Sequence, residues 1–485
     1  MLRTILPTEL RQAEQAAFDA GVSPLLTMET AARAAFDVLV DLLESDCRGK
    51  RVLFLCGPGN NGGDGLAMAR LLVQYGGQPR VIMPEETRSA EAEVNLRHLR
   101  ALGVTIEGMP KRLTRANYDA VVDALYGTGF TGTITANSPV GRLINWANGC
   151  GPMLAVDVPS GMDAATGAVP GVCAQALWTV TFHRPKLGLY LTERRECVGE
   201  ITAASIGLPA ALDPEGGLPV AEEGDLRLLL PKRPASSHKG RCGRTVIYAG
   251  SMGMAGAAIM AARAALHAGA GLTTVICPRD AMPIVQQEVP NATCMAAEDH
   301  PTLTCDALLM GCGIAENEDS YADIMRLKET EAYQVWDAGA LNLLAQHPQI
   351  LGERAVMTPH PGEAARLLGW DISAVLADKL GAAQALREKY GCNVALKSSV
   401  TVLLSADGQQ CAINAVNSPA LAKGGSGDAL AGILAALLGQ RVPMFKAMRA
   451  ASLWLSLAGI EASDRFGVRG SLTLDVIDCL GKCEV

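Results

Sequence analysis

The fold is decided by the stretch Arg51-Val52-Leu53-Phe54-Leu55-Cys56-Gly57-Pro58-Gly59-Asn60-Asn61-Gly62-Gly63-Asp64-Gly65. Its first six residues form a short, nearly continuous apolar run, which is typical of a strand buried on both faces of a parallel sheet. A Gly-rich segment follows at once, and residues 66–75 then have the composition of a helix. A strand, a Gly-rich loop and a helix in this order predict the ligand-binding corner of a doubly wound α/β sheet. The glycine spacing fits neither GxGxxG nor a Walker loop, so the motif does not identify the ligand.

The same arrangement recurs along the first half of the chain. Further strands are predicted at residues 81–83, 118–125 and 153–156, and polar, Gly-containing loops follow the last two. Because the carboxyl ends of parallel strands face one crevice, we expect Asp123 and Asp157 to point at whatever occupies residues 60–65. For either aspartate alone, helix capping is the alternative. Carboxamide, carboxylate and hydroxyl oxygens together suit a hard cation or sugar hydroxyls and disfavour zinc.

A change in amino-acid composition separates the first α/β module from the second. Residues 207–240 are rich in proline and glycine, so we predict a boundary there, between domains at residues 1–215 and 222–485. A second α/β module begins with a predicted strand at 245–249. Further strands are predicted at residues 272–277, 307–310, 333–336, 355–357, 392–396 and 400–404, with a hairpin turn at Asp407-Gly408.

A second Gly-rich loop, Lys423-Gly424-Gly425-Ser426-Gly427-Asp428, runs into the apolar segment 429–434. Backbone N–H groups gathered at a helix N-terminus favour an anion. A carboxylate at Asp428 could accept a proton or orient a hydroxyl beside a bound phosphate. Ordinary helix capping is the alternative. Two further candidates for ligand binding are His360, which lies between two prolines, and Lys397, at a strand end. The alternative for His360 is a purely structural role, and the alternative for Lys397 is a solvated surface lysine.

Composition limits the class of protein. The chain has 485 residues, 49% hydrophobic and 19% charged, which predicts two to three domains with sizeable cores. A net charge of -8 argues against nucleic acid and anionic membranes as partners. No run of about 18 uncharged apolar residues exists, and the fourteen cysteines include no CxxC pair. We therefore expect a cytoplasmic protein with buried thiols, and its Ala-rich helical faces favour a homo-oligomer.

Four motifs in order then give a family resemblance. Residues 60–65, 157–161 (Asp-Val-Pro-Ser-Gly), 358–363 (Thr-Pro-His-Pro-Gly-Glu) and 425–428 (Gly-Ser-Gly-Asp) resemble those of the bifunctional NAD(P)H-hydrate repair enzymes. The likeness extends from about residue 9 to residue 480. It implies an N-terminal epimerase domain with a Rossmann-like doubly wound sheet and a C-terminal dehydratase domain of ribokinase-like α/β fold. The implied substrates are NADHX and NADPHX, in which water has added to the nicotinamide ring. The implied reactions are exchange of the R and S hydrates, then dehydration of the S form with ADP to NAD(P)H, AMP and phosphate.

The resemblance also implies residue roles. In the first domain, the catalytic Asp157 would touch the hydrated ring, and K⁺ would be held by Asn61, Asp123 and Ser160, with sodium or water as alternatives. The pocket would be lined by Asn60, Asn61, Gly62, Gly63, Asp64, Gly127, Thr128, Gly129, Phe130, Thr131, Gly132 and Thr133. In the second domain, which would also use Mg²⁺, the hydrate would meet Ala257, Gly313, His360 and the catalytic base Asp428. The adenine nucleotide would meet Lys397, Ser398, Ser399, Val400, Thr401 and Gly427.

The chain departs from the family pattern at four places. Thr30-Ala31-Ala32 stands where the family has Asn-Ala-Gly, and Gly311-Cys312-Gly313 where it has Gly-Pro-Gly. Gly339 replaces an aspartate, and Ser398 replaces a glycine. An alternative function is a ribokinase-like small-molecule kinase that uses ATP, with a non-catalytic ligand-binding module at the N-terminus. The residues themselves do not decide whether ADP or ATP is the phosphate donor. They also do not decide whether NADHX or NADPHX is the preferred substrate.

Overall fold

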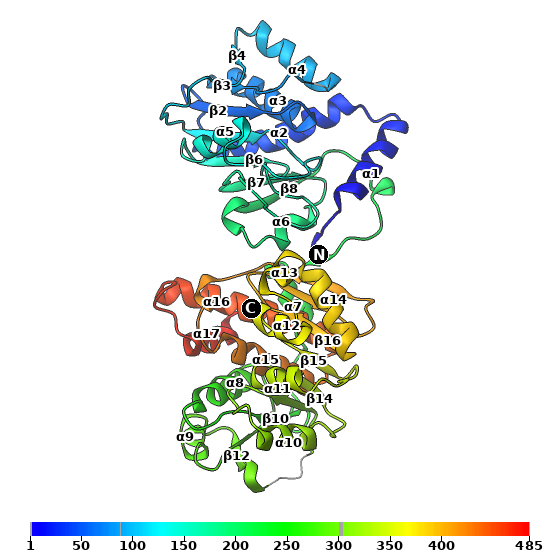
Figure 1. The fold of residues 1–485 in the computed structure, drawn as a ribbon, viewed down its shortest axis with the longest axis vertical. Coiled ribbons are helices and arrows are strands. Elements are labelled where there is room, and N and C mark those ends of the chain that lie inside the picture. Colours follow the sequence, from blue (N-terminus) through cyan, green and yellow to red (C-terminus); the bar gives the residue numbers. More distant parts are fainter. Residues whose placement is uncertain (1, 88, 300–303, 485) are drawn as a thin grey trace. The chain divides into compact units, whose positions relative to one another are not determined.

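The computed structural model describes residues 2–87, 89–299 and 304–484. These form two compact units, one spanning Arg3–Leu218 and the other comprising Leu2 and the chain from Pro219 onward. Met1 and Val485, at which the predicted domains begin and end, lie outside the described residues. Both units are built from mainly parallel sheets with helices between successive strands, so the predicted α/β class is confirmed (Figure 1).

The N-terminal unit contains a seven-stranded, fully parallel sheet. Its spatial order is β4 (Ile106–Glu107), β3 (Gln78–Ile82), β2 (Arg51–Cys56), β5 (Ala120–Ala124), β6 (Met153–Val156), β7 (Trp178–Phe182) and β8 (Glu200–Ala204). The chain moves outward from β2 to one edge and then returns to β5 and proceeds to the other. The strand order therefore reverses between β2 and β5, where Leu55 pairs with Asp123, and such a switch point is where doubly wound sheets bind ligands.

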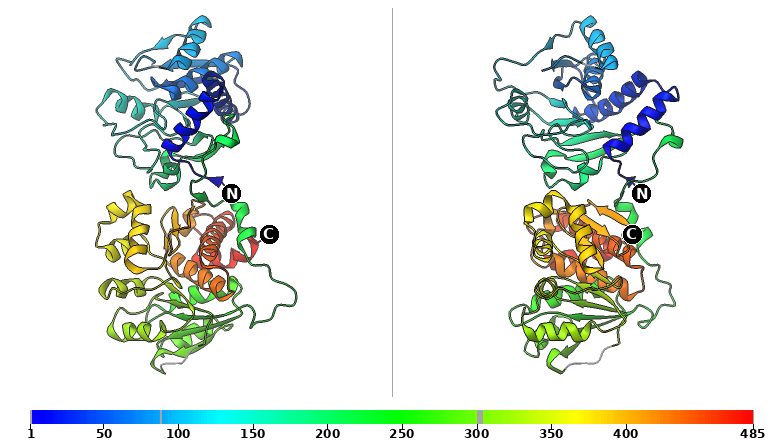
Figure 2. Two further views of the ribbon diagram at one scale, coloured as in Figure 1. Left: turned by 90° about the vertical axis from the view of Figure 1, so that its right-hand side faces the viewer. Right: turned by 45° about the vertical axis from the view of Figure 1, so that its right-hand side comes forward.

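Alternation along β2 explains why helices cover both faces of this sheet. Val52 and Phe54 join the core under α2 (Pro24–Leu42), α3 (Asn60–Gln74) and α4 (Ala90–Ala101). Leu53 and Leu55 join a second core under α5 (Pro139–Ala147). Figure 2 shows the resulting layers, with α1 (Pro7–Asp19) beside α2. The strand at residues 51–56 was therefore correctly predicted as one buried on both sides.

The helix after β2 begins earlier than predicted. We expected a Gly-rich loop up to residue 65, whereas α3 starts at Asn60 and takes most of that segment into its first two turns. The glycines allow this because a Cβ on Gly62 would lie 1.9 Å from the carbonyl oxygen of Gly57, and one on Gly57 would lie 1.8 Å from that of Leu125. The helix N-terminus is thereby brought directly against the ends of β2 and β5.

The C-terminal unit contains an eleven-stranded mixed sheet. Its order is β1 (Leu2–Arg3), β9 (Pro219–Val220), β18 (Cys411–Asn414), β17 (Thr401–Leu404), β16 (Asn393–Leu396), β15 (Ala355–Met357), β14 (Tyr333–Trp336), β13 (Ala307–Met310), β10 (Arg244–Tyr248), β11 (Leu272–Cys277) and β12 (Thr293–Ala296). The strands from β12 to β16 are parallel, while β16, β17 and β18 pair antiparallel. The predicted turn at Asp407-Gly408 joins β17 to β18.

Closely packed helices cover one face of this sheet. Residues of α8 (Ala255–His267), α15 (Ser426–Gly439), α16 (Met444–Phe466) and α17 (Thr473–Cys479) form a single core with the strands. Gly432 permits close approach, because a Cβ there would lie 2.2 Å from the carbonyl oxygen of Ala261. The Ala-rich face of α8 is thus covered inside the unit. The other helices of this unit are α7 (Leu226–Leu229), α9 (Met282–Glu288), α10 (Glu318–Leu327), α11 (Gly339–Gln346), α12 (Pro361–Leu368), α13 (Ile372–Ala377) and α14 (Lys379–Tyr390).

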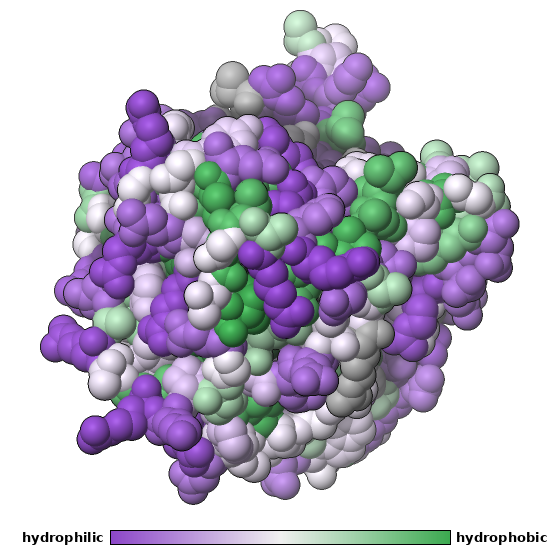
Figure 3. All heavy atoms as spheres, turned by 90° about the horizontal axis from the view of Figure 1, so that it is seen from above, coloured by the Kyte–Doolittle hydropathy of each residue, from purple (hydrophilic) through white to green (hydrophobic). Residues whose placement is uncertain are grey.

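Other sequence predictions concern the cysteines, the membrane and the surface. All fourteen cysteines are free and most are buried, as predicted. Among the described residues, none of the helices combines the length and the apolar character needed to cross a bilayer. The face of the molecule seen in Figure 3 is largely hydrophilic, with small hydrophobic areas between charged side chains.

Candidate active sites

The centre of the N-terminal site is a buried ion pair. Asp157 follows β6 with a left-handed backbone (φ +69°), and its Oδ1 lies 2.5 Å from Nζ of Lys186. The lysine side chain has no exposed surface, and its ammonium also donates to Thr181 Oγ1 and the carbonyl oxygen of Phe182 at 3.0 and 2.9 Å. All three ammonium protons therefore have acceptors, and Asp157 is held with one edge of its carboxylate toward the crevice.

A second carboxyl group gives this site acid–base capacity. Asp64 lies buried in the second turn of α3, and burial, followed by the nearby charge of Asp157, raises its pKa well above the ordinary value. Burial and Asp157 also raise the pKa of Glu14 on α1. A protonated carboxyl group next to an ion-paired carboxylate is the arrangement by which enzymes keep an acid and a base in one pocket.

Two of the three predicted cation ligands, Asp123 and Ser160, are in direct contact. Asp123, fully buried at the end of β5, accepts hydrogen bonds from the backbone N–H of Ser160 at 2.8 Å and from its hydroxyl at 2.7 Å. Burial raises the pKa of Asp123 to about 6. In the part of the chain that the structure describes, the buried carboxamide of Asn61 has no hydrogen-bond partner for either polar atom. An orphaned carboxamide beside hard oxygen donors fits a weakly hydrated cation such as K⁺.

Residues of the loop that follows β5 lie in two different surroundings, one at Asp157 and the other in a separate cavity. Gly127 and Thr128 lie at the aspartate: a Cβ on Gly127 would be 3.0 Å from Asp157 Oδ2 and 3.3 Å from Asn61 Oδ1, and the Thr128 N–H points to Asp157 Oδ2 at 3.3 Å. Phe130 and Thr133 instead line a separate cavity of about 560 Å³, in which Phe130 packs on Tyr126. Gly129, Thr131 and Gly132 are exposed, as is Asn60.

Lys186 and Glu14 were missed by the sequence analysis. Glu14 carried no signal, because it is one of several charges spaced along a helix. Lys186 did carry a signal, since it lies four residues beyond the apolar strand β7. The ends of three other strands had already been predicted to form the site. The segment was passed over because no strand was predicted at 178–182.

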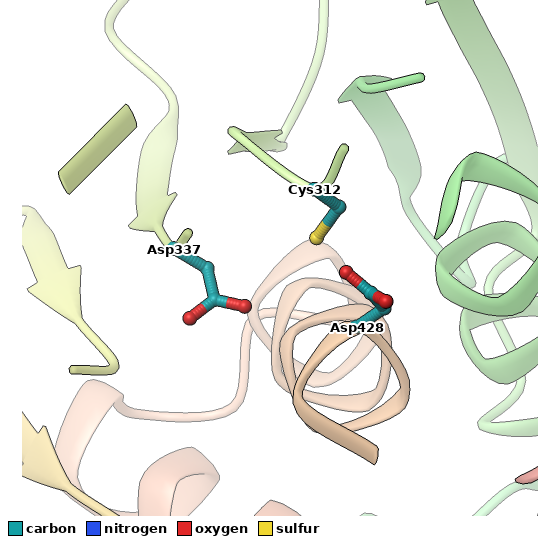
Figure 4. Close-up of side chains that lie close together, drawn as sticks. All are labelled: Cys312, Asp337 and Asp428. Atoms are coloured by element: carbon teal, nitrogen blue, oxygen red, sulfur yellow. The ribbon is translucent and has the colours of Figure 1, made fainter. Parts of the chain in front are cut away.

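The C-terminal site is built around Asp428 in the first turn of α15. Its carboxylate, the thiol of Cys312 and the carboxylate of Asp337 offer atoms within 4.8 Å of one another (Figure 4). Cys312 follows β13 and Asp337 follows β14, so adjacent strand ends meet the helix N-terminus. The N-cap residue Gly425 has φ +96°, and a Cβ there would lie 2.2 Å from Sδ of Met260.

Burial and the neighbouring Asp337 raise the pKa of Asp428 to about 6, despite a hydrogen bond from the Cys312 thiol that lowers it. Burial likewise raises the pKa of Cys312 well above its usual range, followed by the charge of Asp428. Cys312 therefore acts as a neutral donor to Asp428. A carboxylate whose pKa lies just below neutral pH is suited to act as a general base.

Lys397 is an internal cation instead of a solvated one. Its ammonium lies 2.5 Å from Oδ1 of Asp337, whose carboxylate also accepts a hydrogen bond from the Thr358 hydroxyl at 2.8 Å. Burial lowers the pKa of Lys397, but the attraction of Asp337 and Glu363 outweighs burial and raises it. A Cβ on Gly427 would lie only 3.0 Å from Lys397 Nζ. The ammonium is thus held against the N-terminus of α15.

Most residues predicted to hold the nucleotide surround one cavity of about 460 Å³. Lys397, Ser398, Ser399, Thr401 and Gly427 line it, whereas Val400 is a fully buried core residue. The sequence analysis missed several polar lining residues, namely Asn414, Asn417, Ser418, Ser452 and Ser456. Single serines and asparagines on strands and helices gave no pattern from which they could have been selected.

Of the residues predicted to meet the hydrate, Gly313 follows Cys312, which contacts Asp428. A Cβ on Gly313 would lie 2.7 Å from that of Ala257, so these two residues are in contact at the start of α8. His360 is the N-cap of α12, where its Nδ1 accepts the N–H of Gly362 at 3.0 Å, and half of its side chain is exposed. Capping fixes the ring through Nδ1, while Nε2 lies 3.6 Å from Oε1 of Glu363 on the half-exposed side of the ring.

The departures from the family pattern have different surroundings. Thr30 is exposed and donates its hydroxyl to the carbonyl oxygen of Leu26 in its own helix. Gly339 begins α11, and a Cβ there would lie 2.7 Å from Ile314. Ser398 lines the 460 Å³ cavity. Cys312 alone contacts a predicted catalytic residue.

Comparisons with known proteins cover both units. Residues 26–188 match the family model described as YjeF-related protein N-terminus, and residues 245–482 match the model described as NAD(P)H-hydrate dehydratase. The chain is 34% identical to the bifunctional NAD(P)H-hydrate repair enzyme of Moorella thermoacetica, over 98% of this chain and 95% of that protein. It is also 34% identical to the enzymes of the same name from Coxiella burnetii (96% of each chain) and Escherichia coli (98% and 92%).

Solved structures resemble the C-terminal unit. A ribokinase-like superfamily protein from Enterococcus faecalis superposes with a TM-score of 0.51 at 28% identity, over 54% of this chain and 94% of that one. The ADP/ATP-dependent NAD(P)H-hydrate dehydratase from Bacillus subtilis, crystallised with ATP and Mg²⁺, gives 0.50 at 26% identity, over 55% and 97%. The predicted ribokinase-like fold is thereby confirmed.

Proposed function

The chain belongs to the family of bifunctional NAD(P)H-hydrate repair enzymes, and on that basis we propose which of its residues carry the two repair reactions. The proposal assigns epimerisation to the crevice around Asp157 and dehydration to the site around Asp428. The observation that carries it is the position of Asp428, a half-buried carboxylate with a pKa of about 6, next to Gly427 in the wall of a nucleotide-sized cavity.

In the epimerase site, the R and S hydrates differ at the ring carbon that bears the hydroxyl group. Exchange requires this C–O bond to break and water to return on the opposite face. Asp64, whose pKa is raised by burial, supplies the proton with which the hydroxyl leaves as water. Asp157, ion-paired with Lys186, stabilises the cation left on the ring and takes up the proton when water adds back.

K⁺ is the cation we propose for Asn61, Asp123 and Ser160. The support is the orphaned Asn61 carboxamide and the buried Asp123, which together provide oxygen atoms but neither thiolate nor imidazole. The cation would neutralise Asp123 and fix the N-terminus of α3, which carries Asp64 in its second turn. These residues would thus set the geometry of the acid while remaining outside the proton transfers.

In the dehydratase site, hydroxide is a poor leaving group, and phosphorylation makes it a good one. Asp428 accepts the proton of the ring hydroxyl of the S hydrate. The hydroxyl oxygen of the hydrate attacks the terminal phosphoryl group of ADP, and AMP is released. The C–O bond then breaks with loss of phosphate, and a proton leaves the adjacent carbon to give NAD(P)H. The N–H groups at the start of α15, together with Lys397, which lies against them, would stabilise the transferring charge.

Mg²⁺ would enter this site with the nucleotide. Mg²⁺ is usually held by substrate phosphates and one or two carboxylates, and the carboxylates near the cavity are Asp337 and Asp428. The thiol of Cys312 is unsuited to it. When bound, the metal would neutralise phosphate charge, while Asp428 performs the proton transfer.

Chromatography of both epimers tests the assignment. With K⁺, Mg²⁺ and ADP, the wild-type protein is expected to convert R- and S-NADHX completely to NADH. Asp157→Asn should consume only the S form, and Asp428→Asn should form no NADH while still exchanging the epimers. Wild-type exchange in Asp157→Asn would mean that epimerisation is spontaneous. Failure to consume either epimer with ADP or ATP, with turnover of a small alcohol instead, would favour the kinase alternative.

A further inference from the structure

A second large cavity of the C-terminal unit has no role in the assignment above. It measures about 750 Å³ and lies at the carboxyl ends of β10, β11 and β12, beside the N-terminus of α10. Its lining comprises Tyr248, Gly250, Ser251, Pro278, Ala297, Glu298, Ala315, Asn317, Asp319, Ser320, Ala322, Asp323 and Arg326. This volume falls within the range of cavities that enclose ligands of nucleoside size.

The cavity begins where the proposed hydrate site ends. Ser251, in its wall, donates its hydroxyl to the carbonyl oxygen of Gly313 at 2.9 Å. Ala315, also in the wall, follows Gly313 by two residues. Gly313 itself contacts Ala257 beside the hydrate site. A chain of directly connected residues thus leads from the surroundings of Asp428 to this cavity.

Sheet order places the two large cavities on opposite sides of Asp428. The 460 Å³ cavity is lined by residues at β16, β17 and β18 and at the start of α15, and the 750 Å³ cavity by residues that follow β10, β11, β12 and β13. Asp337, which offers a carboxylate oxygen within 4.8 Å of Asp428, follows β14, between these two groups of strands. When ADP occupies the first cavity and the hydrated ring lies at Asp428, the rest of the dinucleotide must extend toward the second.

We propose that the 750 Å³ cavity binds the adenosine half of the hydrated dinucleotide and selects NADHX over NADPHX; this inference rests on the proposed dehydratase function. The cavity wall carries three carboxylates, those of Glu298, Asp319 and Asp323, against one guanidinium. That guanidinium, of Arg326, pairs with Asp323 at 2.9 Å. Carboxylates accept hydrogen bonds from a ribose diol, whereas a 2′-phosphate brings about two further negative charges into the same place.

Charge reversal at one wall residue tests the selectivity. Asp319 lines the cavity, and the adjacent Glu318 does not, although both are exposed residues in the first turn of α10. Asp319→Lys is expected to raise the ratio of kcat/KM for S-NADPHX to that for S-NADHX by about 10-fold, since a like charge is replaced by an opposite one. Glu318→Lys changes the helix N-terminus and the net charge equally and should leave the ratio near its wild-type value. Equal ratios in both variants would overturn the proposed selectivity.

Obstruction of the 750 Å³ cavity tests whether the adenosine half of the hydrate binds there. Ala315→Trp places a large side chain at an exposed wall position, and S-NADHX is compared with the hydrate of reduced nicotinamide mononucleotide, which lacks the adenosine half. We expect kcat/KM for S-NADHX to fall about 10-fold or more, with kcat/KM for the mononucleotide hydrate unchanged. An unchanged value for S-NADHX, or equal losses for both substrates, would overturn the inference while leaving the dehydratase assignment intact. Absence of NADH formation by the wild-type protein would instead overturn the proposed function itself.

Discussion

The ammonium of Lys186 lies 2.5 Å from Oδ1 of Asp157 and has no exposed surface. The two residues are 29 positions apart, at the ends of the adjacent strands β6 and β7. Each constrains the other: the lysine is enclosed by three acceptors, and the aspartate has an unfavourable left-handed backbone that the ion pair helps to maintain. The epimerase site therefore depends on a residue that meets no substrate in the proposed chemistry.

Replacement of Lys186 by methionine should abolish epimerisation and leave dehydration intact. Removal of one partner of a buried ion pair costs about 3–5 kcal/mol, or forces the remaining carboxyl group to take up a proton. Asp157 would then no longer serve as the base, and R-NADHX consumption should fall by about 100-fold or more. Dehydration of S-NADHX uses the other unit and provides the internal reference.

Lys50→Met is the matched control for this variant. Lys50 is partly exposed and lies 3.9 Å from Asp119, a surface pair of the kind that contributes about 1 kcal/mol or less. Epimerisation by Lys50→Met should equal that of the wild type. Retention of epimerisation by Lys186→Met would show that Asp157 needs no fixed cation.

Binding of K⁺ should stabilise the N-terminal unit in a manner that depends on pH. Burial raises the pKa of Asp123 to about 6 from 3.8, so the folded apoprotein binds this proton more tightly than the unfolded chain does. The contribution of Asp123 to stability is therefore full below pH 3.8 and is lost as the pH rises through 6. K⁺ favours the ionised form, so its stabilising effect should be present above pH 6 and vanish below it.

Thermal unfolding in KCl and in a matched choline chloride solution, at pH 5 and pH 8, measures this effect. Asn61→Ala is the informative variant because the carboxamide has no hydrogen-bond partner among the described residues. Its removal should leave stability without K⁺ unchanged or slightly higher, while the increment due to K⁺ disappears. An increment that survives in Asn61→Ala would place the cation elsewhere.

The dehydration rate should follow the ionisation of Asp428. Its pKa of about 6 means that kcat/KM for S-NADHX rises with pH up to about 6 and then levels off. The thiol of Cys312 donates to the carboxylate and lowers this pKa, so Cys312→Ala should move the midpoint to higher pH. Cys312→Ser retains a donor and should restore the wild-type profile. A midpoint that is the same in all three proteins would argue against Asp428 as the titrating base.

The positions of many of the buried strands were predictable from the sequence. Continuous apolar runs such as residues 51–56 and 153–156 became buried parallel strands, because burial on both faces leaves no room for polar alternation. The start of α3 was not predictable, since six residues rich in glycine indicate a loop when only local propensity is considered. Close packing against Leu125 and Gly57, which is a tertiary effect, draws those residues into the helix.

The ion pairs were the part of the site that sequence reasoning could not supply. Lys397 was weighed as a surface lysine, because the sequence does not show that Asp337, 60 residues earlier, lies beneath it. Lys186 was overlooked because no strand was predicted at residues 178–182, and its partner is set by the pairing of that strand, β7, with β6. A buried charge is costly unless it is paired, and the pairing is a property of the sheet, not of the local sequence.

A methyl group on Gly427 should weaken ADP binding specifically. The Cβ of Gly427→Ala would lie 3.0 Å from Lys397 Nζ and 3.6 Å from Asp337 Oδ2, in the wall of the proposed nucleotide cavity. Because Lys397 is held by Asp337, it cannot move aside without breaking that ion pair. We expect KM for ADP to rise about 10-fold, equivalent to about 1.4 kcal/mol, with epimerisation unchanged. Gly424→Ala is the control, since its Cβ would meet no atom within 4 Å. Equal ADP affinity in the two variants would mean that the nucleotide does not approach the N-terminus of α15.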